Sequence, residues 1–245
     1  MVDMAYKSGR VCAACGQLAV PGEWLVAGAV EEGLPTEPLC RNSWCSQPNR
    51  PLSAVYWTGV YEGSLRAAIF AYKYKGDLRW AKSFAHMLSV FLARRATWFE
   101  QYDVICPVPS FRGPGARRDF GHVELFCAEL GWLASGQWPV EQLVGKVAET
   151  EPMSAKPHFA RRRIGRTTLS GAFRVLNPSE VEGCRVLLVD DVCASGETLL
   201  AVSRALRGAG ADEVAALVLA RASWHQPRER DQAGALAPMG LASGP

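Results

Sequence analysis

The sequence of 245 residues contains no uninterrupted apolar stretch of the ~20 residues that a membrane-spanning helix needs. Residues 1–10 have no apolar run behind their charged side chains, so we expect no secretory signal and a cytoplasmic protein whose thiols stay reduced. An excess of one charge is also lacking, because 27 Lys and Arg oppose 24 Asp and Glu. The net charge of +3 is too small to indicate a nucleic-acid-binding protein by itself.

The signatures of several enzyme classes are missing as well. The sequence has no G-x-x-x-x-G-K-[ST] phosphate loop, no H-E-x-x-H of metallopeptidases and no G-x-S-x-G of α/β hydrolases. The histidines are dispersed, and we assign none of them a catalytic role. They are His86, His122, His158 and His225.

Four of the eight cysteines are grouped in two close pairs. Cys12 and Cys15 form a C-x-x-C pair followed by Gly16, and Cys40 and Cys45 are separated by four residues. Two such pairs joined by a loop are typical of a tetrahedral zinc site, and four protein ligands favour a structural role over a catalytic one. Two unrelated pairs of buried thiols are the alternative.

The order of the predicted elements divides the chain into three parts. Residues 1–50 predict a small zinc-binding module, 51–224 an α/β domain, and 225–245 a disordered tail. Strands that alternate with helices predict a parallel sheet flanked by helices. We expect strands at 54–61, 103–106, 185–190 and 213–220, helices from 63, at 78–96, 122–133 and 198–208, and a long polar loop at 145–170.

The segment from Val186 to Leu199 carries the chemistry. A run of aliphatic residues predicts a buried strand that ends in Asp190 and Asp191, and a short loop and a helix follow. The loop from Ala194 to Thr198 can direct backbone N–H groups at a phosphate, aided by the helix dipole. A carboxylate beside a phosphate repels it unless the carboxylate binds a hydroxyl group or a metal ion. The pattern therefore favours a sugar phosphate as the ligand. The alternative is a structural strand with an acidic turn and a serine cap.

These residues resemble the 5-phosphoribosyl-1-pyrophosphate (PRPP) motif of type I phosphoribosyltransferases. With the cysteine pairs, three further stretches are similar to the ComF/GntX family of competence-protein-F-like proteins. The resemblance spans about residues 10–222, and its other stretches are Lys73-Tyr74-Lys75-Gly76-Asp77, Cys106-Pro107-Val108-Pro109 and Gly171-Ala172-Phe173-Arg174-Val175.

The resemblance implies a type I phosphoribosyltransferase-like fold and a PRPP- and Mg²⁺-dependent transfer of the phosphoribosyl group to an unidentified nitrogen acceptor, with release of pyrophosphate. It implies that Asp190 and Asp191 meet the ribose hydroxyls, directly or through Mg²⁺. It further implies a 5′-phosphate held by Ala194, Ser195, Gly196, Glu197 and Thr198, and a pyrophosphate beside Pro107, Val108, Pro109 and Arg112.

Basic residues that could neutralise the leaving pyrophosphate are Arg112, Arg117, Arg118 and Lys146. A solvated basic face or a nucleic-acid patch is the alternative for the arginines. The sequence departs from the family pattern at Ala194, Asp119, Ala148 and Met153, and these departures bear on turnover more than on phosphate binding.

A non-catalytic protein is the alternative function. It would keep the phosphate-binding loop from Ala194 to Thr198, which we call the phosphate cradle. It would either sense PRPP or bind single-stranded DNA in DNA uptake, a process with which ComF-like proteins are associated. The basic run from Arg161 to Arg166 is compatible with contact to single-stranded DNA. Cys193, at the mouth of the cradle, is interpreted as a spacer whose side chain points into the core, rather than a reactive thiol.

Overall fold

The structure is a computed structural model. It describes residues 12, 14–16, 24–25, 39–40, 45, 49–114, 120–134, 137–148, 169 and 171–222. The basic run at 161–166, the residues Arg117, Arg118, Asp119 and Met153, and the predicted tail at 225–245 lie outside these ranges.

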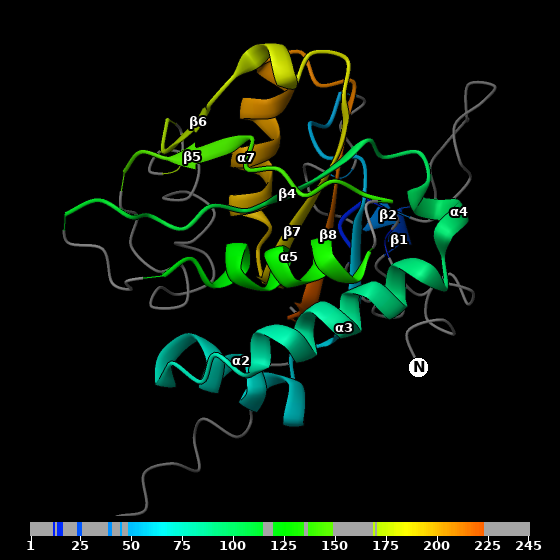
Figure 1. Ribbon diagram of the computed structural model, residues 1–245. Coiled ribbons are helices and arrows are strands. Elements are labelled where there is room, and N and C mark those ends of the chain that lie inside the picture. The colour runs from blue at the N-terminus through cyan, green and yellow to red at the C-terminus, as the bar shows by residue number, and fades with distance from the viewer. Residues whose placement is uncertain are drawn as a thin grey trace, which may run out of the picture.

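A four-stranded parallel sheet forms the centre of the fold (Figure 1). Its order is β3 (Val55–Val60), β8 (Glu213–Arg221), β7 (Arg185–Cys193) and β4 (Val104–Pro107). The two inner strands contain aliphatic runs, 186–189 in β7 and 214–220 in β8, because a strand covered on both faces must exclude polar side chains along most of its length. The predicted parallel sheet is confirmed.

Three helices cover one face of this sheet. They are α2 (Gly63–Lys75), α3 (Trp80–Ala93) and α5 (His122–Leu133), and the short α4 (Ala96–Phe99) follows α3. Ile69 and Tyr72 of α2 are fully buried against the same core as Leu187 and Val189 of β7. The helical spacing of apolar residues in the sequence therefore identifies the buried faces.

The opposite face carries α7 (Glu197–Gly208), an antiparallel hairpin of β5 (Val144–Lys146) and β6 (Phe173–Val175), and the 3-10 helix Pro178–Glu180. Leu199, Val202 and Leu206 of α7 face inward. The hairpin was not predicted, because each of its strands is only three residues long and its first strand falls at the edge of the segment that we expected to be a loop.

The cysteine pair at the N-terminus packs on the domain rather than apart from it. Cys12 and Cys15 are buried in the same core as Trp57. The indole Nε1 of Trp57 donates a hydrogen bond to the carbonyl oxygen of Gly16 at 2.9 Å. Gly16 has a φ of 63°, and a Cβ at this position would lie 2.5 Å from the Val55 carbonyl oxygen. Glycine is therefore required here both for the left-handed turn and for the close approach.

Two further strands belong to the N-terminal part, β1 (Trp24–Leu25) and β2 (Leu39–Cys40), which pair antiparallel. Among the residues that the structure describes, no helix combines the length and the hydrophobicity that crossing a membrane requires.

Strand β7 is longer than predicted. Its pairing with β8 continues through Val192 and Cys193, so the strand ends three residues beyond Asp190. The connection to α7 is accordingly short, because α7 begins at Glu197 and not at the predicted Thr198.

Candidate functional site

The site is built at the carboxyl end of β7, where the strand delivers Asp190 and Asp191. Successive side chains of a strand point to opposite faces of its sheet. Leu187 and Val189 pack in the core under α2, α3 and α5, and Asp191 continues this series. Asp190 follows Leu188, which packs in the core under α7. The two neighbouring carboxylates therefore face different layers.

Asp191 is held by a lysine and a histidine side chain. Its Oδ2 lies 2.6 Å from the Lys73 Nζ of α2 and 2.6 Å from the His122 Nε2 at the first residue of α5. Burial alone would raise the pKa of Asp191, but the charges of Lys73 and His122 outweigh it and hold this pKa well below its usual range. Burial would likewise lower the pKa of Lys73, and the charge of Asp191 raises it instead. The carboxylate is therefore fixed in its ionised form.

His122 connects this ion pair to the loop after β4. The Ser110 Oγ lies 3.3 Å from the His122 Nδ1. Ser110 also donates its backbone N–H to the Glu124 Oε1 at 3.0 Å, and Arg112 lies 3.6 Å from the same oxygen. Tyr72 donates its hydroxyl hydrogen to the His122 carbonyl oxygen at 2.6 Å. One polar network thus joins α2, β7, α5 and the 107–112 loop.

Asp190 is in a different state from its neighbour. Its side chain is only partly buried, and its Oδ1 accepts the backbone N–H of Asp191 at 2.8 Å. Burial, and then the negative charge of Asp191, raise the pKa of Asp190 well above its usual range. This carboxyl group therefore keeps its proton to a higher pH than an ordinary aspartate does.

The loop between β7 and α7 has the geometry of an anion cradle. Gly196 adopts a left-handed conformation with φ 80°, immediately before Glu197, the first residue of a 12-residue helix. Ser195 and Glu197 are buried, and Ala194 and Thr198 are partly exposed. The first backbone N–H groups of a helix have no partner within it and favour an anion. The predicted strand–loop–helix arrangement is present.

Arg221, the last residue of β8, ties this loop to the cysteine pair. It is 1% exposed and donates to the carbonyl oxygens of Cys15 at 3.1 Å, Cys193 at 2.7 Å and Ala194 at 2.5 Å. A buried guanidinium is tolerated only where its N–H groups find acceptors. The cysteine module and the cradle therefore share one buried side chain.

Three of the four predicted metal ligands come together. The Sγ atoms of Cys12, Cys15 and Cys45 all lie within 4.8 Å of one another, and all three residues are buried. Convergent, buried thiols fit a thiolate-bound metal ion, since a tetrahedral ion needs its ligands on a small sphere. Cys40 lies on β2, and its side chain is outside the described part of the chain.

The remaining cysteines are structural where the structure describes them. Cys193 is 3% exposed, and burial raises its pKa. Burial raises the pKa of Cys106 to about 12 and that of Cys127 well above its usual range, so these thiols stay protonated. Cys184 is only partly buried, and its thiol donates to the Glu180 carbonyl oxygen at 3.3 Å.

The predicted pyrophosphate-side residues occupy the end of β4 and the loop after it. Pro107 and Glu124 line an open pocket of about 600 Å³, which is also lined by Gln142 and Trp132. Lys146 lies on β5 with its Nζ 5.7 Å from the centre of the Phe173 ring. The sequence reasoning missed His122, which was set aside as dispersed, and gave Lys73 no role although its stretch was noted. Neither residue carries a local signal, because both reach Asp191 from other elements.

Comparison with known proteins places these features in a family. Residues 144–236 match the phosphoribosyl transferase domain family. A protein of Escherichia coli O157:H7 named DNA utilization protein YhgH is 28% identical over 223 residues, which is 90% of this chain and 94% of that protein. Competence protein F of Haemophilus influenzae is 29% identical over 168 residues, 67% of this chain and 71% of that protein.

Among solved structures, a purine phosphoribosyltransferase from Pyrococcus horikoshii is 17% identical, covers 60% of this chain and 91% of that one, and gives a TM-score of 0.34. A likeness at this TM-score carries no argument of its own. The domain match and the two named relatives confirm the resemblance to ComF-like proteins seen in the sequence and support a phosphoribosyltransferase-like fold.

Proposed function

We propose that the protein binds PRPP at the carboxyl end of β7 and transfers its phosphoribosyl group to a nitrogen acceptor. The observation that carries this proposal is the junction of two acidic residues, a left-handed Gly196 and the N-terminus of α7 at one end of a buried strand. A helix N-terminus favours phosphate oxygens, and carboxylates favour hydroxyl donors. A phosphorylated ribose offers both groups.

Each part of the ligand has residues to meet it. The loop from Ala194 to Thr198 would hold the 5′-phosphate through backbone N–H groups and the hydroxyls of Ser195 and Thr198. Asp190 and Asp191 would accept the ribose hydroxyls, and Lys73 and His122 keep the second carboxylate charged and in place. The loop of Pro107, Val108, Pro109 and Arg112 would border the pyrophosphate.

The transfer breaks the bond between the anomeric carbon and the pyrophosphate oxygen, and pyrophosphate leaves with the electron pair. The acceptor nitrogen forms the new bond with its lone pair and loses a proton. Positive charge develops on the ribose ring, so the protein must stabilise this charge and exclude water. Mg²⁺, when bound with PRPP, would neutralise charge on the leaving group.

We further propose that the metal held by Cys12, Cys15, Cys40 and Cys45 is a structural zinc ion. Thiolates are soft ligands that select zinc, and four of them leave no open coordination position. Such a site needs reduced thiols, which suits a cytoplasmic location.

A link to DNA uptake is part of the proposal, since relatives carry the names DNA utilization protein and Competence protein F. One observation favours an accessory role without turnover. Arg112, a candidate for the pyrophosphate, is already paired with Glu124 at 3.6 Å. In that alternative the protein keeps the cradle and senses PRPP or contacts single-stranded DNA.

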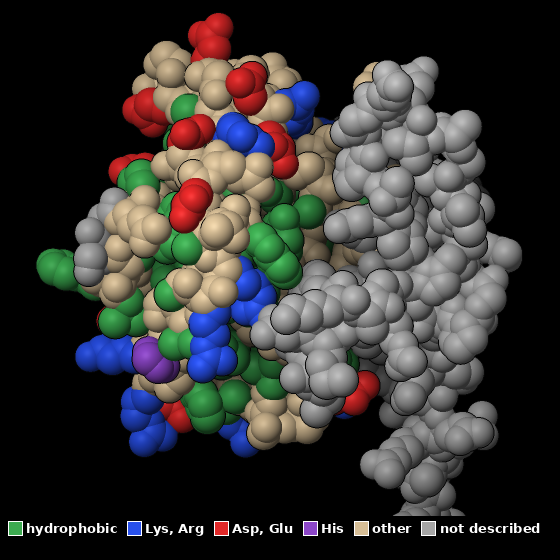
Figure 2. Space-filling view, turned by 90° about the vertical axis from the view of Figure 1, so that its right-hand side faces the viewer, with side chains coloured by type: hydrophobic (Ala, Val, Ile, Leu, Met, Phe, Trp, Pro, Cys, Tyr) green, Lys and Arg blue, Asp and Glu red, His purple; other side chains and the backbone are tan. Residues whose placement is uncertain are grey.

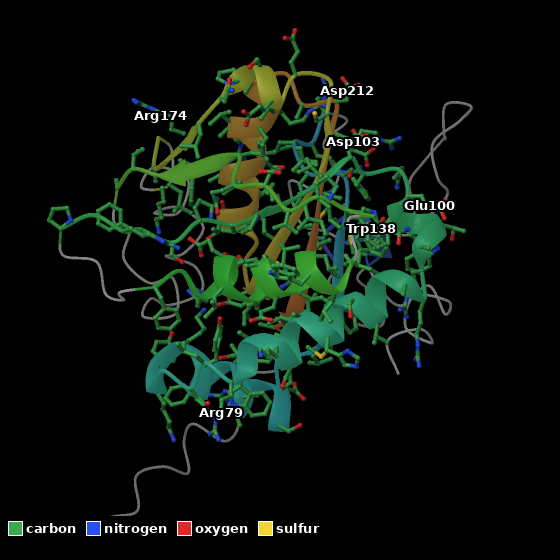
Figure 3. All side chains as sticks on the ribbon, viewed as in Figure 1. Arg79, Glu100, Asp103, Trp138, Arg174 and Asp212 are labelled. Carbon is green, nitrogen blue, oxygen red and sulfur yellow. The ribbon has the colours of Figure 1, made fainter. Side chains whose placement is uncertain are left out.

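Pyrophosphate release tests the transferase directly. The protein is incubated with PRPP, Mg²⁺ and a panel of nitrogenous bases, and we expect base-dependent release that the double variant Asp190→Asn/Asp191→Asn loses. Asp212→Asn is the matched control, because Asp212 is exposed just before the first residue of β8. It therefore lies at the end of the parallel sheet opposite to the candidate site (Figure 3). PRPP binding without release from any base would support the sensing role instead.

A further inference from the structure

Positive charge is concentrated on one stretch of a nearly neutral chain. Residues 63–95 contain seven Lys and Arg and a single acidic residue, Asp77, so this stretch carries +6 where the whole chain carries +3. The stretch forms α2, α3 and the turn between them. The Asp77 carboxylate is itself bound by Arg79, at 2.8 and 2.9 Å. Figure 2 shows blue side chains gathered low on the molecule, level with these helices in Figure 1, and red ones gathered at the top.

Large apolar side chains are exposed on the same elements. Phe70 and Tyr74 of α2 are 48% and 56% exposed, and Leu78 and Trp80 follow in the turn and at the start of α3. The rings of Phe70 and Tyr74 lie one helical turn apart, with centroids separated by 5.0 Å. Adjoining exposed rings leave an apolar patch in contact with water, and such a patch is typical of a binding surface.

The outer side of α2 carries both cations and aromatic rings. Arg66, Phe70 and Tyr74 recur at a spacing of four residues, which places them on one face of the helix. Arg66 and Lys75 are exposed, and both line a shallow pocket with Phe70. The inner side of the same helix is committed to the core through Ile69 and Tyr72.

We propose that this outer face of α2, with the turn to α3, binds single-stranded nucleic acid. Arg66 and Lys75 meet the phosphates, and the exposed faces of Phe70 and Tyr74 stack on unpaired bases. A positively charged surface with exposed rings matches such a ligand on both counts, since the backbone is a polyanion and every base has a planar face. A duplex offers phosphates but keeps its base faces covered, so it would leave the rings exposed.

This face is separate from the site on β7. Lys73, between the exposed positions, turns inward and meets Asp191, whereas Tyr74 points outward. The inference does not rest on the proposed transferase activity, because strand binding on the outer face needs no PRPP.

Fluorescence anisotropy of the full chain with a labelled oligothymidylate, without PRPP, tests the proposal across a range of salt concentrations. We expect salt-dependent binding that is tighter for the single strand than for a duplex of the same length. The variant Phe70→Ala/Tyr74→Ala should lose about tenfold or more in affinity at fixed salt, because stacking on rings is removed. The variant Arg66→Gln/Lys75→Gln should lower the slope of log affinity against log salt by about 1.4, which is two phosphate contacts on a single strand.

Matched controls have the same chemistry elsewhere on the surface. Trp98→Ala removes a ring of α4 that is 38% exposed, and Arg174→Gln removes an exposed cation of β6. Figure 3 places Arg174 at the opposite end of the molecule from Arg79, which marks the turn before α3. Both controls should bind like the unmodified protein.

Three results would overturn the proposal. The first is binding that is absent or independent of salt. The second is equal affinity for single strand and duplex with no effect of Phe70→Ala/Tyr74→Ala, which would leave only a general polyanion surface. The third is a Phe70→Ala/Tyr74→Ala variant whose sedimentation coefficient changes while its affinity for the oligonucleotide does not. That result would make this face an interface between copies of the chain.

Discussion

The Nζ atom of Lys73 lies 2.6 Å from the Oδ2 atom of Asp191, which joins the first long helix of the domain to the strand that carries the candidate site. Both side chains are largely buried, with 18% and 5% exposed. The contact fixes the charge and the position of the Asp191 carboxylate. Its neighbour Asp190 remains partly exposed and has a raised pKa. The two acidic residues are therefore not equivalent, although they are neighbours in the sequence.

Replacing Lys73 by methionine should destabilise the protein. Asp191 would keep only the contact with His122, and an incompletely compensated buried carboxylate costs about 3 kcal/mol. In Lys73→Met/Asp191→Asn neither charge is left unpaired, so we expect the double variant to be less destabilised than the two single variants added together. Urea unfolding of the four proteins checks this coupling, and strictly additive losses would show that the contact contributes nothing.

Replacing Asp190 by asparagine should stabilise the protein at pH 8 and weaken PRPP binding. A carboxyl group whose pKa is raised on folding contributes stability that is complete below its ordinary pKa of about 4 and is lost as the pH rises toward the folded value. Asparagine has no carboxyl proton to lose, so the variant keeps this stability as the pH rises. We expect a Tm roughly 2–4 °C above the unmodified protein at pH 8, and a difference that narrows at pH 5.

Thermal unfolding of both proteins in a buffer without added Mg²⁺ and without a chelator measures this difference while any zinc stays bound. An unchanged Tm at both pH values would contradict the assigned environment of Asp190. A PRPP affinity equal to that of the unmodified protein would exclude this carboxylate from the ribose site.

Arg221→Met should be among the most destabilising single substitutions on β8. Methionine fills a similar volume but removes the guanidinium donor from the carbonyl oxygens of Cys15, Cys193 and Ala194. The loss of unfolding free energy should reach about 3 kcal/mol, because buried acceptors that lose their partner are costly. Arg204→Met is the control, since Arg204 is exposed on α7 and should change stability little. Equal effects of the two substitutions would refute the role of Arg221.

Metal removal should loosen the N-terminal module and the core beneath it. Cys12, Cys15 and Cys45 are buried beside Trp57, so thiols that lose a shared ion leave an unfilled polar site in an apolar core. We expect protein purified under reducing conditions to contain one zinc ion per chain and to have a lower Tm after chelation. Elemental analysis that finds no metal would rule out the zinc site.

Much of the fold can be read from the sequence because its central strands are strongly apolar. The aliphatic run before Asp190 and the similar run from Val214 can only be buried on both faces, which dictates a covered parallel sheet. The glycine and hydroxyl residues after Cys193 likewise mark the turn into α7. These features depend on local composition and periodicity alone.

The partners in the site depend instead on tertiary packing. Lys73, His122 and Arg221 come from three different elements, and nothing in their immediate neighbours distinguishes them from surface residues. The period-two alternation of a strand could have predicted that Asp190 and Asp191 face different layers. The short β5–β6 hairpin is too brief to give a periodic signal, and its pairing depends on the domain around it.

The most direct test of a sugar-phosphate site on β7 is calorimetric titration of the full chain with PRPP and Mg²⁺. We predict a saturable heat of binding that is retained in Asp212→Asn and abolished in Asp190→Asn/Asp191→Asn. The absence of any binding heat at millimolar PRPP, in protein shown to be folded and loaded with zinc, would contradict the account.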